Sequence, residues 1–250
     1  MNTATAHPCL AVDQVSAGYG GGTVINEVTL EASRGEVVAI LGANGVGKTT
    51  TMRVISGLIK PNRGTVLLEG SPIDSDPVRT VQSGIALVPE DRCLFRSLTA
   101  AKNLSLAARP GRWDTSAVVD LFPPLKALLR RRAGLLSGGE QQMLAIARAL
   151  VMNPKVLLID ELSTGLAPLV ARQLLSTLRC LADEEGMTVL MVEQHVPLAL
   201  ETADRVYVLR KGQIVRQGAA SDLRDSLTDL SSSYLGGHES GHRGSDRDTA

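Results

Sequence analysis

A glycine-rich stretch in the first quarter of the chain has the residue types that bind phosphate groups. Residues 42-GANGVGKT-49 match the pattern G-x-x-x-x-G-K-[ST]. Glycines at these positions allow backbone N–H groups to wrap phosphate oxygens, Lys48 can reach the β- and γ-phosphates of a nucleotide, and the Thr49 hydroxyl can bind Mg²⁺. An apolar run precedes the stretch and a helix-forming run follows it, as this motif requires. The residues predicted to hold a magnesium-bound nucleoside triphosphate are Gly42, Ala43, Asn44, Gly45, Val46, Gly47, Lys48, Thr49 and Thr50.

Two adjacent carboxylates end an apolar run in 155-KVLLIDE-161. Ligands of open α/β sheets bind beyond the carboxyl ends of the strands, so Asp160 is expected near Lys48. We predict that Asp160 holds Mg²⁺ through water and that Glu161 polarises the attacking water as a general base. The alternative for such a pair is a helix N-cap after a strand. The phosphate loop in the same chain favours the metal and base roles.

A second glycine-lined helix start lies at 135-LLSGGEQQ-142. Ser137, Gly138 and Gly139 are turn-forming, whereas the residues from Glu140 onward form helix readily. Free N–H groups and the positive end of the helix dipole make such a start suitable for an anion. The chain therefore has two predicted anion-binding helix starts.

The elements that must position these residues alternate between strands and helices. The spacing predicts antiparallel strands within 10–30, buried or short strands at 36–42, 64–70, 84–90, 155–161 and 187–194, helices within 94–154 and at 167–185, and a hairpin at 205–218. Strands that alternate with helices indicate a parallel sheet covered on both faces.

Composition excludes several classes of function. Lysine plus arginine and aspartate plus glutamate both number 26, and aromatic residues make up 2%, which disfavours nucleic-acid binding. Three scattered cysteines, Cys9, Cys93 and Cys180, favour neither disulfides nor zinc and suit a reducing compartment. The N-terminus lacks signal-peptide features, and no apolar run approaches the roughly 18–20 residues that span a bilayer.

The order of the motifs resembles one family. Tyr19, the stretch 42–49, LSGGEQ at 136–141, the strand 156–161 and His195 occur as in the ATP-binding subunits of ABC transporters, over about residues 10–235. The resemblance implies an α/β fold: a P-loop NTPase (RecA-like) core with a mixed sheet, an N-terminal antiparallel β subdomain and a small inserted α-helical subdomain. It assigns the nucleotide-binding domain to residues 1–237, with the helical subdomain at about 94–154. The polar residues 238–250 are expected to form a disordered tail.

The resemblance also implies roles for single residues. Tyr19 would stack on adenine, and His195 would contact the γ-phosphate and help to hold the catalytic geometry. Without the family, Tyr19 would be a loop tyrosine and His195 a structural histidine. The helix start would cap the γ-phosphate of ATP bound by a second subunit, through Ser137, Gly138, Gly139 and Glu140.

Two departures from the family pattern affect these roles. Glu90, in 88-VPEDRCLF-95, stands where the family usually has a glutamine that senses Mg²⁺. A carboxylate still binds Mg²⁺ but cannot donate an N–H when ionised. Ala167 stands where aspartate is common in the loop after Glu161. We expect that loop to reach a partner through Ser163, Thr164 and its backbone.

Loop details narrow the resemblance. Glu90 after Val-Pro, the run Thr164–Pro168 and 192-VEQH-195 resemble the ATP-binding subunits of branched-chain (hydrophobic) amino-acid importers, whose sister branches import urea or short amides. The resemblance implies an ATPase, peripheral at the cytoplasmic face of the membrane, that dimerises with an identical or related cassette. Its other partners would be permease subunits, docked near Phe95 and Leu98, and indirectly a solute-binding protein. A soluble ABC ATPase and a P-loop kinase are the alternatives, although kinases lack LSGGE.

Overall fold

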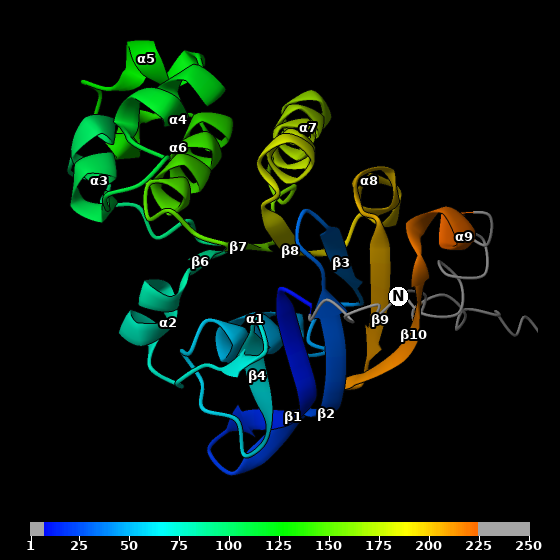
Figure 1. Cartoon of the computed structure of the whole chain (residues 1–250). Helices are drawn as coiled ribbons and strands as arrows, with labels where there is room; N and C mark the ends of the chain where they lie inside the picture. Colours follow the sequence, from blue (N-terminus) through cyan, green and yellow to red (C-terminus); the bar gives the residue numbers. More distant parts are fainter. Residues whose placement is uncertain (1–7, 225–250) are drawn as a thin grey trace, which may run out of the picture.

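The computed structural model describes residues 8–224, which contain two β-sheets (Figure 1). An antiparallel sheet has the order β2-β1-β4-β5, formed by β1 (Leu10–Tyr19), β2 (Gly22–Ala32), β4 (Arg63–Leu68) and β5 (Ser71–Pro72). A second sheet has the order β10-β9-β3-β8-β7-β6, formed by β3 (Val37–Leu41), β6 (Ile85–Val88), β7 (Val156–Asp160), β8 (Thr188–Glu193), β9 (Arg205–Arg210) and β10 (Gln213–Ala219). Only β10 pairs antiparallel in this sheet, so the sheet is mixed.

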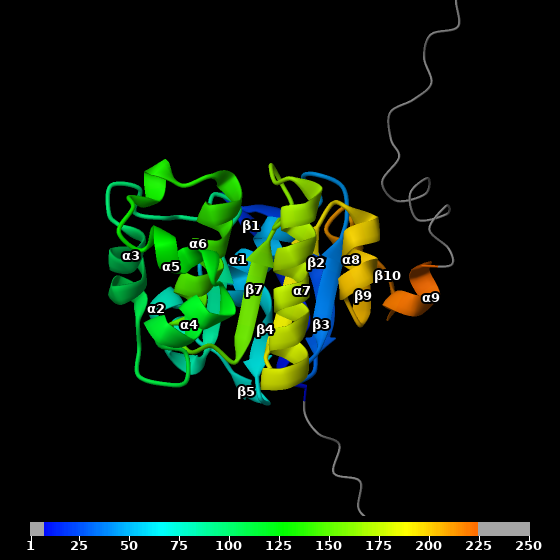
Figure 2. The ribbon, with the colours of Figure 1, turned by 90° about the horizontal axis from the view of Figure 1, so that it is seen from above.

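Helices cover the mixed sheet on both faces. They are α1 (Lys48–Ile55), α2 (Pro77–Ser83), α3 (Ala100–Ala107), α4 (Thr115–Leu121), α5 (Pro124–Leu128), the 3-10 turn η1 (Ala133–Leu135), α6 (Gly138–Leu150), α7 (Pro168–Glu185), α8 (Val196–Thr202) and α9 (Ala220–Arg224). Figure 2 shows α7 over the strands of the mixed sheet, between α8 and the group formed by α3 to α6. The fold class predicted from the sequence, including the antiparallel sheet and the inserted helices, is confirmed.

The side-chain alternation of a strand explains the two cores. In β3, Val38 and Ile40 pack into a core that includes Met52 and Ile55 of α1 and the antiparallel sheet. The neighbouring residues of β3 point to the opposite face, into the core that includes α6 and α7. A strand buried on both faces therefore consists only of apolar residues, as β3 does.

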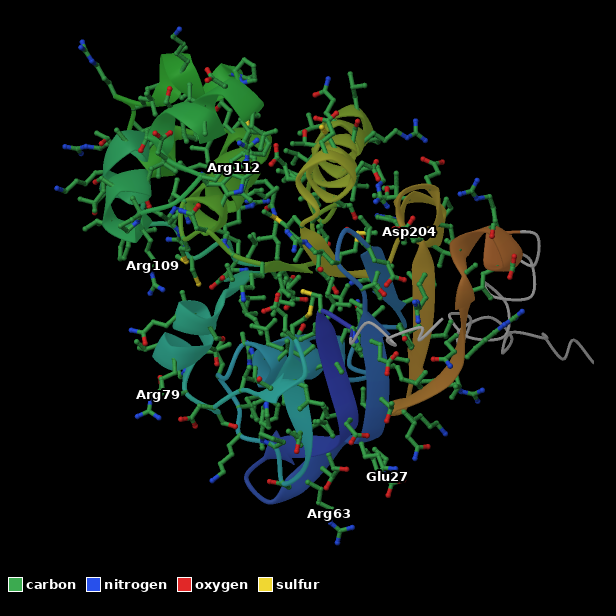
Figure 3. All side chains as sticks on the ribbon, in the orientation of Figure 1. Glu27, Arg63, Arg79, Arg109, Arg112 and Asp204 are labelled. Carbon is green, nitrogen blue, oxygen red and sulfur yellow. The ribbon has the colours of Figure 1, made fainter. Side chains whose placement is uncertain are left out.

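The helices α3 to α6, here called the helical lobe, are inserted between β6 and β7. Arg112 of the lobe, labelled in Figure 3, forms an ion pair with Glu185 at the end of α7. Asn153 donates to the carbonyls of Arg109 and Trp113, at 3.0 and 3.3 Å, and so fastens the α3–α4 connection to the end of α6. The ion pair to α7 thus joins the lobe to the core in addition to the two chain segments that connect it to β6 and β7.

Two parts of the sequence prediction concern residues outside this description. The predicted domain end at residue 237 and the predicted disordered tail 238–250 lie outside the described residues 8–224. Within that described range, no helix combines the length and the apolar character that spanning a membrane requires.

The β9–β10 turn joins three parts of the molecule. Gly212 accepts a hydrogen bond from the N–H of Asn26 in β2 at 2.8 Å, and its own N–H donates to the carbonyl of Val46 in the glycine-rich stretch at 3.0 Å. Its φ is 78°, and a Cβ there would lie 2.2 Å from the carbonyl oxygen of Val24. Only glycine therefore allows this turn to lie against β2 and to support the stretch 42–49.

We expect Gly212→Ala to lower the free energy of unfolding by about 2 kcal/mol or more, because left-handed strain and a backbone clash add together. Gly20→Ala is the matched control: its φ is 56°, but nothing lies within 4 Å of the added Cβ. That control should cost about 1 kcal/mol. Urea unfolding of both variants measures the difference, and equal losses would show that the close approach to Val24 is unimportant.

Candidate functional site

The glycine-rich stretch connects β3 to α1, as its motif requires. Gly45 and Gly47 have φ values of 76° and 112°, and α1 begins at Lys48 without a side-chain cap. A Cβ on Gly42 would lie 2.5 Å from the carbonyl of Leu209, and one on Gly47 2.6 Å from the side chain of Ile25. A larger residue at Gly42 or Gly47 would therefore clash with its neighbours. Because α1 has no side-chain cap, the N–H groups at its start are free to bind an anion.

A cavity of about 310 Å³ lies over this helix start. It is lined by Val24, Asn44, Gly45, Gly47, Lys48, Thr49, Thr50, Glu90, Glu161 and Gln194. The fold therefore brings the stretch 42–49 together with Glu90 and Glu161, which come from other strand ends. The volume lies within the range of small-molecule sites.

The buried ammonium group of Lys48 belongs to the lining of this cavity. Its side chain is 4% exposed, and Nζ donates to the carbonyls of Gly42 at 2.9 Å and Ala43 at 3.1 Å. Nζ also lies 3.5 Å from Oε1 of Glu161. These partners satisfy the ammonium group, because a buried charge without partners would be costly.

Asp160 ends β7 on the same side as α1. The Thr49 hydroxyl donates to its Oδ1 at 3.3 Å. The pKa of Asp160 is raised to about 6 by burial and, to a smaller extent, by the charges of Glu161 and Glu90, against the lowering effects of the hydrogen bond from Thr49 and the charge of Lys48. The cavity thus has an excess of carboxylates.

The oxygen groups of this cavity fit a magnesium ion that is shared with phosphates. The described residues contain no group of three or more His, Cys, Asp or Glu side chains that could hold a metal. Mg²⁺ commonly takes one or two protein oxygens and completes its shell with water and substrate phosphates. Thr49, Asp160 and Glu90 provide hard oxygen ligands of that kind, and a divalent cation would offset their excess negative charge.

Glu161 reaches the cavity through an unusual backbone conformation. In an extended strand it would point away from Asp160, but its φ is 52°. This left-handed conformation is uncommon outside glycine, and here it turns the carboxylate toward Lys48. Thr164 Oγ1 donates to Glu161 Oε2 at 3.2 Å. The carboxylate is therefore held in place by its own loop as well as by the lysine.

Gln194 is the residue that the sequence prediction missed. Its Nε2 donates to both carboxylate oxygens of Glu161 at 2.9 Å, and it lines the cavity. His195 is exposed, directly precedes α8 as its N-cap residue and does not line the cavity. The structure therefore gives to Gln194 the place at the cavity where the sequence analysis expected His195.

The alternation of β8 explains this difference. Leu190 and Val192 point toward the core that contains α1, and Gln194 continues that series two residues later. Glu193 continues the opposite series and is buried on the other face. Counting alternate residues along the predicted strand would have identified Gln194 from the sequence.

Glu193 fastens the loop that follows Glu161. Its carboxylate accepts from the N–H of Ser163 at 3.0 Å and from the Ser163 hydroxyl at 2.7 Å. Burial raises the pKa of Glu193, although the two hydrogen bonds from Ser163 lower it. Ser163 is buried and points inward, whereas Thr164 is exposed. Of the two side chains predicted to reach a partner, only Thr164 lies at the surface.

Tyr19 and the second helix start lie outside the cavity. Tyr19 ends β1, is 49% exposed, and its hydroxyl accepts a hydrogen bond from Arg53 of α1 at 3.2 Å. Ser137 caps α6 in a capping box: the Ser137 N–H donates to Glu140 Oε2 at 2.7 Å, and the Glu140 N–H donates to Ser137 Oγ at 3.4 Å. Ser137 and Gly138 are exposed, and Gly139 and Glu140 are half-buried. This helix start therefore faces away from the cavity of its own chain.

The fold and the cavity define a phosphate-loop nucleotide-binding protein. Comparison with known proteins narrows the class. The family model described as "ABC transporter" matches residues 25–164, more than half of the chain. The protein "High-affinity branched-chain amino acid transport ATP-binding protein BraG" of Pseudomonas aeruginosa is 41% identical over 236 residues, which are 91% of this chain and the whole of the relative. The chain belongs to the ABC transporter family, as an ATP-hydrolysing cassette subunit.

Two further similarities are relevant to its function. The "Probable branched-chain amino acid transport ATP-binding protein LivF" of Archaeoglobus fulgidus is 37% identical over 84% of this chain and 92% of the relative. The dimeric structure of a post-hydrolysis ATP-binding cassette bound to ADP and Pi is 26% identical, with a TM-score of 0.74, over 84% of this chain and 98% of that structure. The similarity thus extends over almost the entire length of both relatives.

The raised pKa of Asp160 predicts a pH-dependent stability. Its carboxyl has a pKa of about 6 in the folded protein and 3.8 when unperturbed. The folded state therefore keeps this proton more tightly than the unfolded state, and the free energy of unfolding falls as the pH rises from about 4 to about 6. Above that range the ionised carboxylate costs about 3 kcal/mol.

Asp160→Asn should accordingly raise the free energy of unfolding by about 3 kcal/mol at pH 7.5 and change it little near pH 4. Urea unfolding of metal-free, nucleotide-free protein at both pH values provides the measurement. A stabilisation of equal size at the two pH values would contradict the assignment to this carboxyl.

Proposed function

We propose that this chain is the ATPase subunit of an importer for branched-chain or other hydrophobic amino acids. The proposal rests on one observation: the predicted nucleotide-binding groups lie in two separate places, the cavity and the helix start at Ser137. Lys48 and Glu161 line one cavity, with Asp160 beside it on the Thr49 hydroxyl, whereas Ser137 at the other helix start is exposed and lies outside that cavity. The names of the two relatives, which are amino-acid transport ATP-binding proteins, support the class of solute.

MgATP would occupy the cavity and the surface beside it. The backbone N–H groups from Gly42 to Thr50 and the ammonium group of Lys48 would hold the phosphates. Tyr19, which is 49% exposed, would stack on adenine. Thr49, Asp160 and Glu90 would hold Mg²⁺, which when bound would neutralise charge on the β- and γ-phosphate oxygens.

Glu161 is proposed as the general base. When nucleotide binds, the γ-phosphate would compete for Lys48, which now contacts Glu161 and the carbonyls of Gly42 and Ala43. Glu161 would then accept a proton from water placed between its carboxylate and the γ-phosphate. Gln194 and Thr164 donate to Glu161 and would keep the carboxylate aimed at that water.

The helix start Ser137–Glu140 would bind the γ-phosphate held by a second cassette. Its exposure and its distance from the cavity of its own chain support this role. The dimeric cassette bound to ADP and Pi gives a precedent for such a pair. ATP would then hold two subunits together, and hydrolysis would release them.

The remaining partners follow from the importer role. Permease subunits would dock on the face that carries Phe95, which is 53% exposed, and Leu98, which is half-buried. The protein would thereby lie at the cytoplasmic face of the membrane and serve a solute-binding protein indirectly. Isolation of the permease from solubilised membranes with this chain, followed by amino-acid uptake assays, would identify the solute.

Glu161→Gln should lower the turnover of ATP by roughly 100-fold or more, because the amide cannot accept the proton. Nucleotide should still bind, so an ATP-held dimer should accumulate in size-exclusion chromatography. Ser176→Ala, at an exposed position on α7, is a control that should leave turnover unchanged. Hydrolysis by Glu161→Gln at the wild-type rate would refute the proposed function.

Gln194→Leu should lower kcat by about tenfold while KM for ATP stays constant, because the lost hydrogen bonds aim the base and do not bind nucleotide. His195→Ala should leave both constants unchanged, since that side chain does not line the cavity. Steady-state kinetics of the two variants decides between these neighbours. A loss of kcat in His195→Ala alone would instead support the contact with the γ-phosphate that the sequence predicts for His195.

A further inference from the structure

A second cavity, here called the back pocket, lies at the opposite edge of the mixed sheet from the nucleotide site. Residues that precede three parallel strands line it: Arg34 before β3, Lys155 before β7 and Met187 before β8. Lys48 and Asp160, by contrast, lie at the carboxyl ends of β3 and β7. Because these strands run parallel, their two kinds of end lie on opposite edges of the sheet. The back pocket is therefore separate from the site predicted to hold ATP.

The floor of the back pocket is apolar and small. Cys9, Trp113, Pro154 and Met187 line it, and all four are buried. The pocket has a volume of about 180 Å³. That is the volume of roughly six water molecules at about 30 Å³ each, which is too little for a nucleotide. The floor and the volume together suit a small ligand with an aliphatic part.

The rim of the back pocket carries charges of both signs. Lys155 Nζ lies 2.5 Å from Glu69 Oε2, with both side chains 51% exposed, and Arg112 forms an ion pair with Glu185. Exposed ion pairs contribute little to stability, so a ligand can share these groups at small cost. Arg34 is also exposed, and it forms no hydrogen bond or ion pair with another described residue. Its guanidinium is thus available to an anionic group.

Arg34 and Glu69 lie near the same part of the floor. Burial is the main cause that raises the pKa of the Cys9 thiol. Among its charged neighbours, Glu69 raises this pKa, whereas Lys155 and Arg34 lower it. Nε of Arg34 lies beside Gly186, 3.3 Å from where a Cβ would stand. The pocket therefore offers a cationic and an anionic group together, next to buried apolar residues.

We propose that the back pocket binds a small zwitterionic amino acid with an aliphatic side chain. Arg34 donates to its α-carboxylate, Glu69 accepts from its α-ammonium group, and its side chain packs on Trp113 and Met187. A simple carboxylate would meet Arg34 but would be repelled by Glu69, so the two charges together select a zwitterion. The inference goes beyond the proposed function, because this binding requires neither ATP nor a second subunit.

The fluorescence of Trp113 provides a direct test, because it is the single tryptophan of the chain and lines the back pocket. L-leucine titrated into nucleotide-free, full-length protein should change this fluorescence until it saturates, and saturating MgATP should not displace the leucine. Isocaproate lacks the ammonium group of leucine, and isoamylamine lacks its carboxylate. Each should bind at least about tenfold more weakly than leucine, because each loses one charge-assisted contact.

Two pocket variants with matched controls locate the binding. Arg34→Gln and Glu69→Gln should each raise the dissociation constant for leucine by about tenfold. Arg63→Gln and Glu27→Gln remove the same charges from exposed residues that do not line the pocket, and they should bind leucine as the unmodified protein does. Glu27 shares with Glu69 a φ of 50°, so the second pair is matched in backbone conformation as well.

Three outcomes would overturn the proposal. Leucine at millimolar concentrations would leave the tryptophan fluorescence unchanged, or it would bind equally well to the pocket variants and their controls. Alternatively, isocaproate would bind as tightly as leucine, which would show that the pocket selects a simple anion. Protein that hydrolyses ATP but does not bind leucine would keep the proposed function and lose only this inference.

Discussion

A single buried ammonium group faces three carboxylates in this protein, and much of the structure serves that arrangement. Lys48 is the one basic side chain among the described residues that line the cavity, and Glu90 and Glu161 line it as well, with Asp160 directly beside Thr49. Burial first, and then the like charges of Glu161 and Glu90, raise the pKa of Asp160. Negative charge is therefore in excess at the site of the protein alone. Its geometry suits an incoming cation together with phosphates, and this explains why the chain keeps so much negative charge in a partly enclosed space.

The strand ends decide which side chains take part. Residues that alternate along β7 and β8 direct Asp160 and Gln194 to the face that carries α1, and Glu193 to the opposite face. Glu161 escapes this rule because its backbone is left-handed. The strain is offset by hydrogen bonds to its carboxylate from Gln194 and Thr164 and by the ion pair with Lys48. The carboxylate is thus held by residues from three separate segments.

The helical lobe carries the second glycine-lined helix start, which lies outside the cavity. Its outward helix start is shaped locally by the capping box of Ser137 and Glu140. Its position relative to the cavity depends on contacts that cross between the lobe and residues 89–98, through Arg92 and Arg148. A polar contact is directional, so it fixes orientation more strictly than apolar packing of the same area. Local sequence thus forms the helix start, and tertiary contacts set its orientation relative to the cavity.

The sequence by itself determined every feature that depends on neighbouring residues. The glycines of 42–49, the apolar run that ends at Asp160 and the capping box at Ser137 each have local causes, and the alternation of strands and helices predicted the sheet. Only the tertiary structure decided that Ser163 is turned inward toward Glu193 and that Arg92 meets Gln142. These contacts join residues 30 to 50 positions apart, and they depend on strand registers and on one left-handed residue. Local propensity cannot specify such contacts, because they are decided when separate segments pack against each other.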